Sequence, residues 1–188
     1  MTRLKVLVNR PRRTLAALAT VLVAVGITAA SGASFTASSA SPGNVFATGT
    51  LTMSSSKDNA AIMNVGNLRP GDPASTGQVD IQNTGSLSGA FSLSRSALTD
   101  SDTTNPLSGK LNVVIADCGV WSGGSAPSCT GATTKYTGTL AGLTSAVNLG
   151  TFVASEKHRY QFSVTLDSTA DNGYQGDSSN ATFTFNAV

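Results

Sequence analysis

The sequence predicts an all-β fold, an antiparallel β-sandwich of jelly-roll type, and three observations predict it. Short segments place apolar residues at every second position, turn-forming residues separate these segments, and the composition is rich in Thr, Ser, Gly and Val. Beyond the first 33 residues, amphipathic helical stretches of about twelve residues are missing from the sequence. Short strands divided by turns are typical of sandwiches and jelly rolls.

The first 33 residues have the three parts of a secretory signal peptide. Basic residues fill the start, the apolar segment Leu15–Ile27 follows, and small residues lead to a predicted cleavage between Ala33 and Ser34. A membrane anchor is the alternative, but a helix of thirteen residues spans roughly 20 Å of a hydrocarbon core about 30 Å thick. The pair Arg12-Arg13 leaves twin-arginine export open as a route. We therefore predict a secreted protein.

Cleavage would change the charge of the protein. The whole chain has twelve basic and ten acidic residues, a net charge of +2, and five of the basic residues lie in the signal peptide. The mature chain keeps seven basic against ten acidic residues, a net charge of −3, without a basic cluster. Nucleic acid and membrane are therefore not expected partners of the mature protein. The predicted parts are the signal peptide 1–33, an N-terminal segment 34–43 and a sandwich domain 44–188.

Two segments in the first half of the domain show apolar alternation. In QVDIQ, residues 78–82, Val79 and Ile81 are expected on the buried face, and in AFSLS, residues 90–94, Phe91 and Leu93 are. The turn-rich segment NTGSLSG joins them, so the sequence predicts that they pair as a β-hairpin. An earlier strand is expected within NVFATGTLTM, residues 44–53.

The second half of the domain contains three further strand patterns. The segment KLNVVIADC, residues 110–118, is apolar almost throughout, as in a central strand. Residues 159–166 alternate, with Tyr160, Phe162, Val164 and Leu166 expected inward, and the last residues place Phe183 and Phe185 on one face. A short helix is expected within residues 138–150.

The chain has two cysteines, Cys118 and Cys129, both in the exported part. In an oxidising compartment such a pair predicts a disulfide, and Trp121 is expected to pack over it. A loop of this length contributes up to roughly 3 kcal/mol of stability in the chain-entropy model. A redox or metal pair would instead need closer spacing or nearby histidines.

Three stretches, in this order, resemble the TasA/camelysin family of secreted matrix proteins: NVFATGTLTM, LRPGDPASTGQVDIQNTGSLSGAFSLS and DNGYQGDSSNATFTFNAV. The most specific pieces are Pro70-Gly71-Asp72 and the turn residues Asn172, Tyr174, Gln175 and Gly176. The Pro-Gly that is usual in the family before the penultimate strand is replaced by ASEKHRY, which leaves the subgroup open. The resemblance spans most of the mature chain.

The resemblance implies a jelly-roll domain that leaves the cell by a SipW-type signal peptidase and forms biofilm-matrix fibres by strand exchange. In that scheme the mature N-terminus adds a strand to the next subunit. The candidate donor strand begins with Ser34, Phe35, Thr36 and Ala37. Its composition of small polar residues equally fits a disordered tether, so both interpretations stay open.

The sequence does not predict an enzyme. Camelysin relatives have been described as metallopeptidases, but a zinc protease of the H-E-x-x-H type needs two histidines, and this chain has only His158, beside Glu156 in a segment expected to be a solvated turn. No metal or cofactor is predicted. Oxygen-bearing side chains near the last turn leave calcium open, although their spacing does not fit an EF-hand: Asp167, Asp171, Asn172 and Asp177.

Two functions from different classes follow. The first is a structural subunit of an extracellular fibre on a Gram-positive cell surface or in its matrix, with other copies or related matrix proteins as partners. The second is a monomeric surface module for adhesion or ligand binding, whose turns form the binding face.

Overall fold

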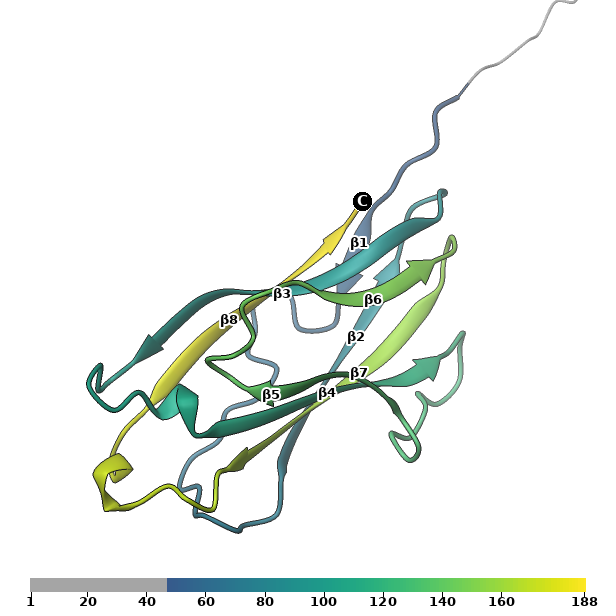
Figure 1. Cartoon of the computed structure of the whole chain (residues 1–188). Coiled ribbons are helices and arrows are strands. Elements are labelled where there is room, and N and C mark those ends of the chain that lie inside the picture. The colour runs from purple at the N-terminus through teal and green to yellow at the C-terminus, as the bar shows by residue number, and fades with distance from the viewer. Residues whose placement is uncertain (1–46) are drawn as a thin grey trace, which may run out of the picture. The chain divides into compact units, whose positions relative to one another are not determined.

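The computed structural model describes residues 47–188, which form eight β-strands and two short 3₁₀ helices (Figure 1). The predicted cleavage position Ala33/Ser34 and the candidate donor strand lie outside the described residues. The elements in chain order are β1 Met53–Ser55, β2 Ser75–Asn83, β3 Gly89–Asp100, η1 Leu107–Gly109, β4 Leu111–Val120, β5 Thr133–Thr139, β6 Val147–Phe152, β7 Lys157–Leu166, η2 Asn172–Tyr174 and β8 Ser179–Ala187.

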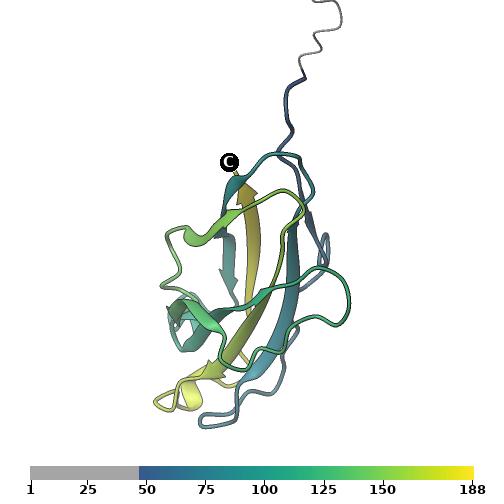
Figure 2. The same ribbon diagram turned by 90° about the vertical axis from the view of Figure 1, so that its right-hand side faces the viewer.

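The strands form two antiparallel sheets of unequal size. The five-stranded sheet has the order β1-β2-β7-β4-β5, and the three-stranded sheet has the order β6-β3-β8. Figure 2 shows the two sheets as facing layers. The all-β sandwich that the sequence predicts is therefore confirmed. Among the described residues, no helix is long and apolar enough to cross a membrane.

The predicted hairpin between residues 78–82 and 90–94 is wrong. β2 pairs with β1 and β7, whereas β3 pairs with β6 and β8, so the two strands belong to different sheets. The connection between them crosses the sandwich because the buried side chain of Asn83 anchors it. The Asn83 amide nitrogen donates to the carbonyl oxygens of Leu87, Phe152 and Val153, and its oxygen accepts from the Gly85 N–H.

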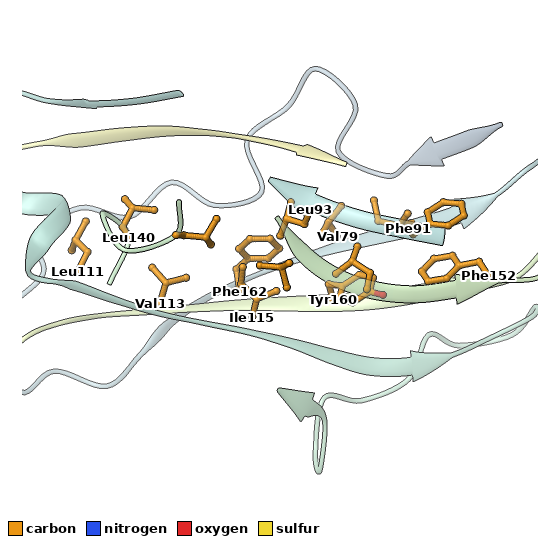
Figure 3. Close-up of a cluster of buried hydrophobic side chains, with 14 residues drawn as sticks. Val79, Phe91, Leu93, Leu111, Val113, Ile115, Leu140, Phe152, Tyr160 and Phe162 are labelled. Carbon is orange, nitrogen blue, oxygen red and sulfur yellow. The ribbon is translucent and has the colours of Figure 1, made fainter. Parts of the chain in front are cut away.

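The core lies between the sheets, and strand alternation builds it. Val79, Ile81, Phe91, Leu93 and other apolar side chains at every second position are almost fully buried, as predicted. Figure 3 shows them in one layer between the strands. Its other members are Leu111, Val113, Ile115, Leu140, Leu143, Val147, Leu149, Phe152, Tyr160 and Phe162. In β7 the prediction holds along the strand, although Val164 and Leu166 are only partly buried.

Two local predictions need correction. The described part of the first predicted strand is regular only over β1, because residues 47–52 run beside the β2–β3 connection with side-chain and isolated backbone hydrogen bonds instead of a continuous ladder. The expected helix within residues 138–150 is absent, since turns at Leu140–Thr144 lead into β6 there. The helical turns are η1 and η2, each of three residues.

Over part of β2, the long loop of residues 56–74 covers the inner face of the strand. A Cβ atom added to Gly77 would lie 2.5 Å from the Ile62 carbonyl oxygen and 2.8 Å from Met63 Cβ. Gly77 has the same parity as the inward residues Val79 and Ile81, so the loop crosses the inner face of the strand. The three-stranded sheet therefore does not cover this part of the larger sheet, and the loop covers it instead.

Candidate functional site

The last strand, β8, forms an edge of the three-stranded sheet. It pairs with β3 from Phe91↔Ala187 to Asp100↔Ser179, with one bulge between Arg95 and Ala97. In the sheet order it has a neighbour on one side only. An edge strand presents unpaired backbone donors and acceptors, which makes it a template for a further strand.

The hydrogen-bond pattern identifies which residues of β8 face the open side. Ala90 and Val188 exchange two backbone hydrogen bonds, 2.8 and 3.0 Å long, and Ser101 N–H donates to the Ser178 carbonyl oxygen. Because paired residues alternate along an antiparallel ladder, even-numbered residues of β8 bond to β3 and odd-numbered residues direct N–H and C=O outward. Within residues 47–188, no backbone group bonds to this outer edge.

The side chains of β8 alternate as the sequence predicts. Phe183 and Phe185 point to the core side and are partly buried, and the Phe183 ring centroid lies 5.1 Å from that of Phe162 in the opposite sheet. Thr184 on the outer face is exposed and donates a 2.8 Å hydrogen bond to Ser96 Oγ of β3. The open edge is therefore apolar on its inner side and polar on its outer side.

The described chain begins close to where β8 ends. Ser86 and Leu87 donate backbone hydrogen bonds to the Thr50 carbonyl oxygen, which holds residues 47–52 beside the β2–β3 connection. A Cβ atom on Gly89 would lie 2.6 Å from the Leu51 methyl groups and 3.0 Å from the Val188 carbonyl oxygen. Figure 1 shows the first described segment passing beside the C-terminus on its way to β1. Residues 50 and 51 therefore lie at the end of the sandwich where β8 finishes.

The predicted disulfide between Cys118 and Cys129 is present, with its Cα atoms 4.4 Å apart. It closes the loop between β4 and β5, and Gln78 of β2 donates to the Cys129 sulfur at 3.5 Å. Trp121 has the Lys157 ammonium 3.9 Å and the Arg159 guanidinium 5.8 Å from its ring centroid, and its expected packing over the disulfide stays a prediction.

The family-like turn before β8 has structural contacts. Asn172 and Tyr174 lie in η2, whose first turn is capped by Asp171, because its carboxylate accepts from the Gly173 N–H. Gln175 donates its backbone N–H to the Asn172 carbonyl oxygen, and Gly176 has φ +81°, a conformation that favours glycine. These contacts direct the chain into β8.

The acidic side chains near this turn are engaged separately. Asp167 accepts from Thr169 and Asn112, and these hydrogen bonds lower its pKa to about 2. Asp177 accepts from the Ser101 hydroxyl group, at another strand end. In the part of the chain that the structure describes, no group of three or more His, Cys, Asp or Glu side chains could hold a metal ion.

The segment with Glu156 and His158 is not a solvated turn. His158 belongs to β7, points to the core side, and has a side chain only 12% exposed. Asp117 of β4, also predicted only as part of an apolar strand, is buried beside it. Both positions continue the inward alternation of their strands, Leu111-Val113-Ile115-Asp117 and His158-Tyr160-Phe162, and that pattern was the available signal.

Comparison with known proteins gives one family. No curated protein matches the chain. The model of the family described as camelysin metallo-endopeptidase matches residues 12–106, which is about half of the sequence and includes β1, β2 and β3 in full. With the β-sandwich and the sequence motifs, this match confirms the resemblance seen in the sequence, and the chain belongs to the camelysin family.

Proposed function

We propose that this chain is a structural subunit of a secreted fibre, in which the N-terminal segment of one molecule adds a strand to β8 of the next. The observation that carries the proposal is the open edge of β8, with outward backbone groups at Ser179, Ala181, Phe183, Phe185 and Ala187. Strand addition would satisfy these groups and cover the partly buried phenylalanines. Membership of the camelysin family supports the proposal at the family level.

The length of the N-terminal segment suits such an exchange. Residues 34–46 can span about 43 Å when extended, at about 3.3 Å per residue, whereas the nine residues of β8 need about 30 Å. Pro42 lacks an N–H group, so it favours an end of pairing between residues 34–41 and the neighbouring strand. The remaining residues then form the link to the donor's own domain.

The donor has one large apolar anchor. In an extended strand, Phe35 and Ala37 share a face and Thr36 lies on the other face. Phe35 would pack beside Phe183 and Phe185, where full burial of a phenylalanine contributes about 1.5–3 kcal/mol. One such anchor and a backbone ladder give moderate affinity for each contact between neighbouring subunits.

The first experiment compares proteins 34–188 and 44–188 by size-exclusion chromatography and negative-stain electron microscopy. We expect fibres or ladders of oligomers only from the longer protein. Monomers from both proteins at high concentration, over a range of salt and pH, would contradict the proposal.

Substitutions in the donor segment and in β8 separate donor from acceptor. Phe35→Ser should abolish assembly of protein 34–188, whereas the matched change Thr36→Ser, on the opposite face, should preserve it. Ala181→Pro removes an outward N–H group without removing a bond to β3, so it should block acceptance of a strand. Unfolding curves must show that each variant is folded, and assembly by folded Ala181→Pro protein would argue against this edge.

The family description raises the question of a metallopeptidase, and the side chains of this domain do not fit the metal. The two nitrogen atoms of His158 contact carboxylates on opposite sides of the ring, so these carboxylates cannot converge with it on one ion. We propose that the protein is not a peptidase. Casein cleavage by the recombinant protein would overturn this proposal if a chelator abolishes the cleavage. A control preparation from the same host without this protein must lack the activity.

A monomeric adhesion module is the second candidate, and the cluster around Trp121 favours it. The partly exposed indole lies on the outer face of the five-stranded sheet beside Lys157 and Arg159. Such an aromatic and cationic surface is suited to recognition. A saturable ligand whose binding is lost in Trp121→Ala, with no fibres from the parent protein, would favour this function.

A further inference from the structure

His158 lies in a stack of rings that crosses the sandwich. Its ring centroid is 4.2 Å from that of Phe152, at 19° between planes, and 6.1 Å from that of Tyr160. Phe152 stacks in turn on Phe91 of the three-stranded sheet, 4.2 Å away. The ring of His158 therefore packs against aromatic rings of the core, and its two nitrogen atoms make its polar contacts.

Both nitrogen atoms face carboxylates. Nδ1 lies 3.1 Å from each oxygen of Asp117, and Nε2 lies 3.1 Å from Oε1 of Glu156. A carboxylate only accepts hydrogen bonds, and a neutral imidazole has one N–H group. Both contacts are hydrogen bonds only when the ring carries two protons, so this geometry fits the imidazolium cation.

The other groups around the ring balance this charge. Lys135 of β5 has its ammonium 3.6 Å from Asp117 Oδ2 and donates to the Leu149 carbonyl oxygen. With His158 protonated, two cations face the two carboxylates, and the cluster is neutral. The Tyr160 hydroxyl group is buried without a partner, and burial raises its pKa, so it adds no charge. Lys157 and Arg159 alternate to the opposite face of β7, where they pair with Asp80.

We propose that protonated His158 is a pH-sensitive clip that fastens the β6–β7 turn to β4. The turn carries Glu156, whose other carboxylate oxygen accepts from the Val153 N–H at 2.6 Å and whose carbonyl oxygen accepts from the Asn83 N–H at 2.9 Å. Asn83 also bonds to the Phe152 and Val153 carbonyl oxygens. The clip therefore holds the place where both connections, β2–β3 and β6–β7, cross between the sheets.

The electrostatics agree with the geometry. Burial alone disfavours the charged ring, but the hydrogen bonds and charges of Asp117 and Glu156 outweigh it, and the pKa of His158 is raised above 6.5. Burial likewise disfavours the Asp117 carboxylate, but the His158 contact and the Gly119 N–H bond outweigh it and lower the pKa of Asp117. A raised histidine pKa stabilises the fold below about pH 6.5, and the contribution is lost as pH rises through the folded pKa.

The chain has one histidine, so its titration can be read without assignment. We would label histidine in protein 44–188, which lacks the candidate donor strand, remove any histidine tag, and follow the ring signals by NMR from pH 5 to 10. The expected result is one transition with a midpoint above 6.5. A midpoint at or below 6.5 in the folded protein would overturn the proposal.

A pair of matched variants tests the clip itself. Glu156→Gln removes one charge beside His158, and it should lower the His158 midpoint and speed amide exchange in residues 153–158. Asp102→Asn makes the same charge change in an exposed loop before η1, and it should leave both unchanged. An unchanged midpoint in Glu156→Gln would contradict the clip. These readouts require only the folded domain, so they are independent of whether the protein forms fibres.

Discussion

Strands β7 and β8 share an alternating pattern of inward aromatic residues but have different environments. Each places two aromatic side chains at alternating inward positions, yet Tyr160 and Phe162 are at most 1% exposed, whereas Phe183 and Phe185 are only partly buried. β7 has a strand on each side, and β8 has one neighbour. Alternation therefore defines which face of a strand is buried, and the number of neighbouring strands decides how completely. Because β8 has one neighbouring strand and only partly buried aromatic side chains, we propose that it is the functional edge.

The largest expected effect is on β7. Phe162→Ala should lower the free energy of unfolding of the monomer by about 3–5 kcal/mol, because the cavity would form at a site enclosed by both sheets. Urea unfolding of protein 44–188 measures it. A loss below about 1 kcal/mol would mean that β7 is no better enclosed than β8.

The disulfide tests whether the five-stranded side depends on a covalent link. Replacing Cys118 and Cys129 together by Ser should cost up to roughly 3 kcal/mol, since the loop between β4 and β5 is released in the unfolded chain. The same unfolding experiment, with and without reductant, measures this loss. Reductant should have no effect on the double variant, and a reductant effect there would indicate another cause.

Phe183→Ala tests the corresponding aromatic position in β8. In monomeric protein 44–188 it should cost about 1–2 kcal/mol, less than Phe162→Ala, because part of the ring already contacts solvent. In assembled protein 34–188 its cost should increase, because an added strand would complete the burial. Equal losses in the two states would show that nothing further covers Phe183 on assembly.

The smallest effect is expected on the outer face of β8. Thr184→Ala removes an exposed hydrogen bond to Ser96 and should change the free energy of unfolding by no more than about 0.5 kcal/mol. Thermal or urea unfolding checks it. A much larger loss would mean that the outer face of β8 is also covered.

The sequence predicts which face of each strand is buried, but it does not predict which strands pair. Val79, Ile81, Phe91 and Leu93 are buried as their alternation predicts, because period-two patterning depends on each strand alone. The β2–β3 hairpin failed because nothing local in NTGSLSG distinguishes a turn within one sheet from a crossing between two. The crossing depends on Asn83, whose partners Phe152 and Val153 lie some 70 residues away.

The candidate site shows the same limit. The last strand could be predicted, but its open edge depends on which strands lie beside it. The His158 cluster could not be assembled from sequence, because Asp117, Lys135 and Glu156 come from three separate elements. Its one local signal was a titratable residue that continues the inward alternation of an apolar strand.

The most direct test of the central claim is amide exchange in β8, residue by residue. In monomeric protein 44–188, the outward N–H groups of Ala181, Phe183 and Phe185 should exchange much faster than the even-numbered N–H groups that bond to β3. Adding a peptide of residues 34–43, or measuring fibres of protein 34–188, should slow the odd-numbered residues selectively. Binding or assembly that leaves Phe183 and Phe185 in fast exchange would show that the added strand lies elsewhere, and the account of β8 would be wrong.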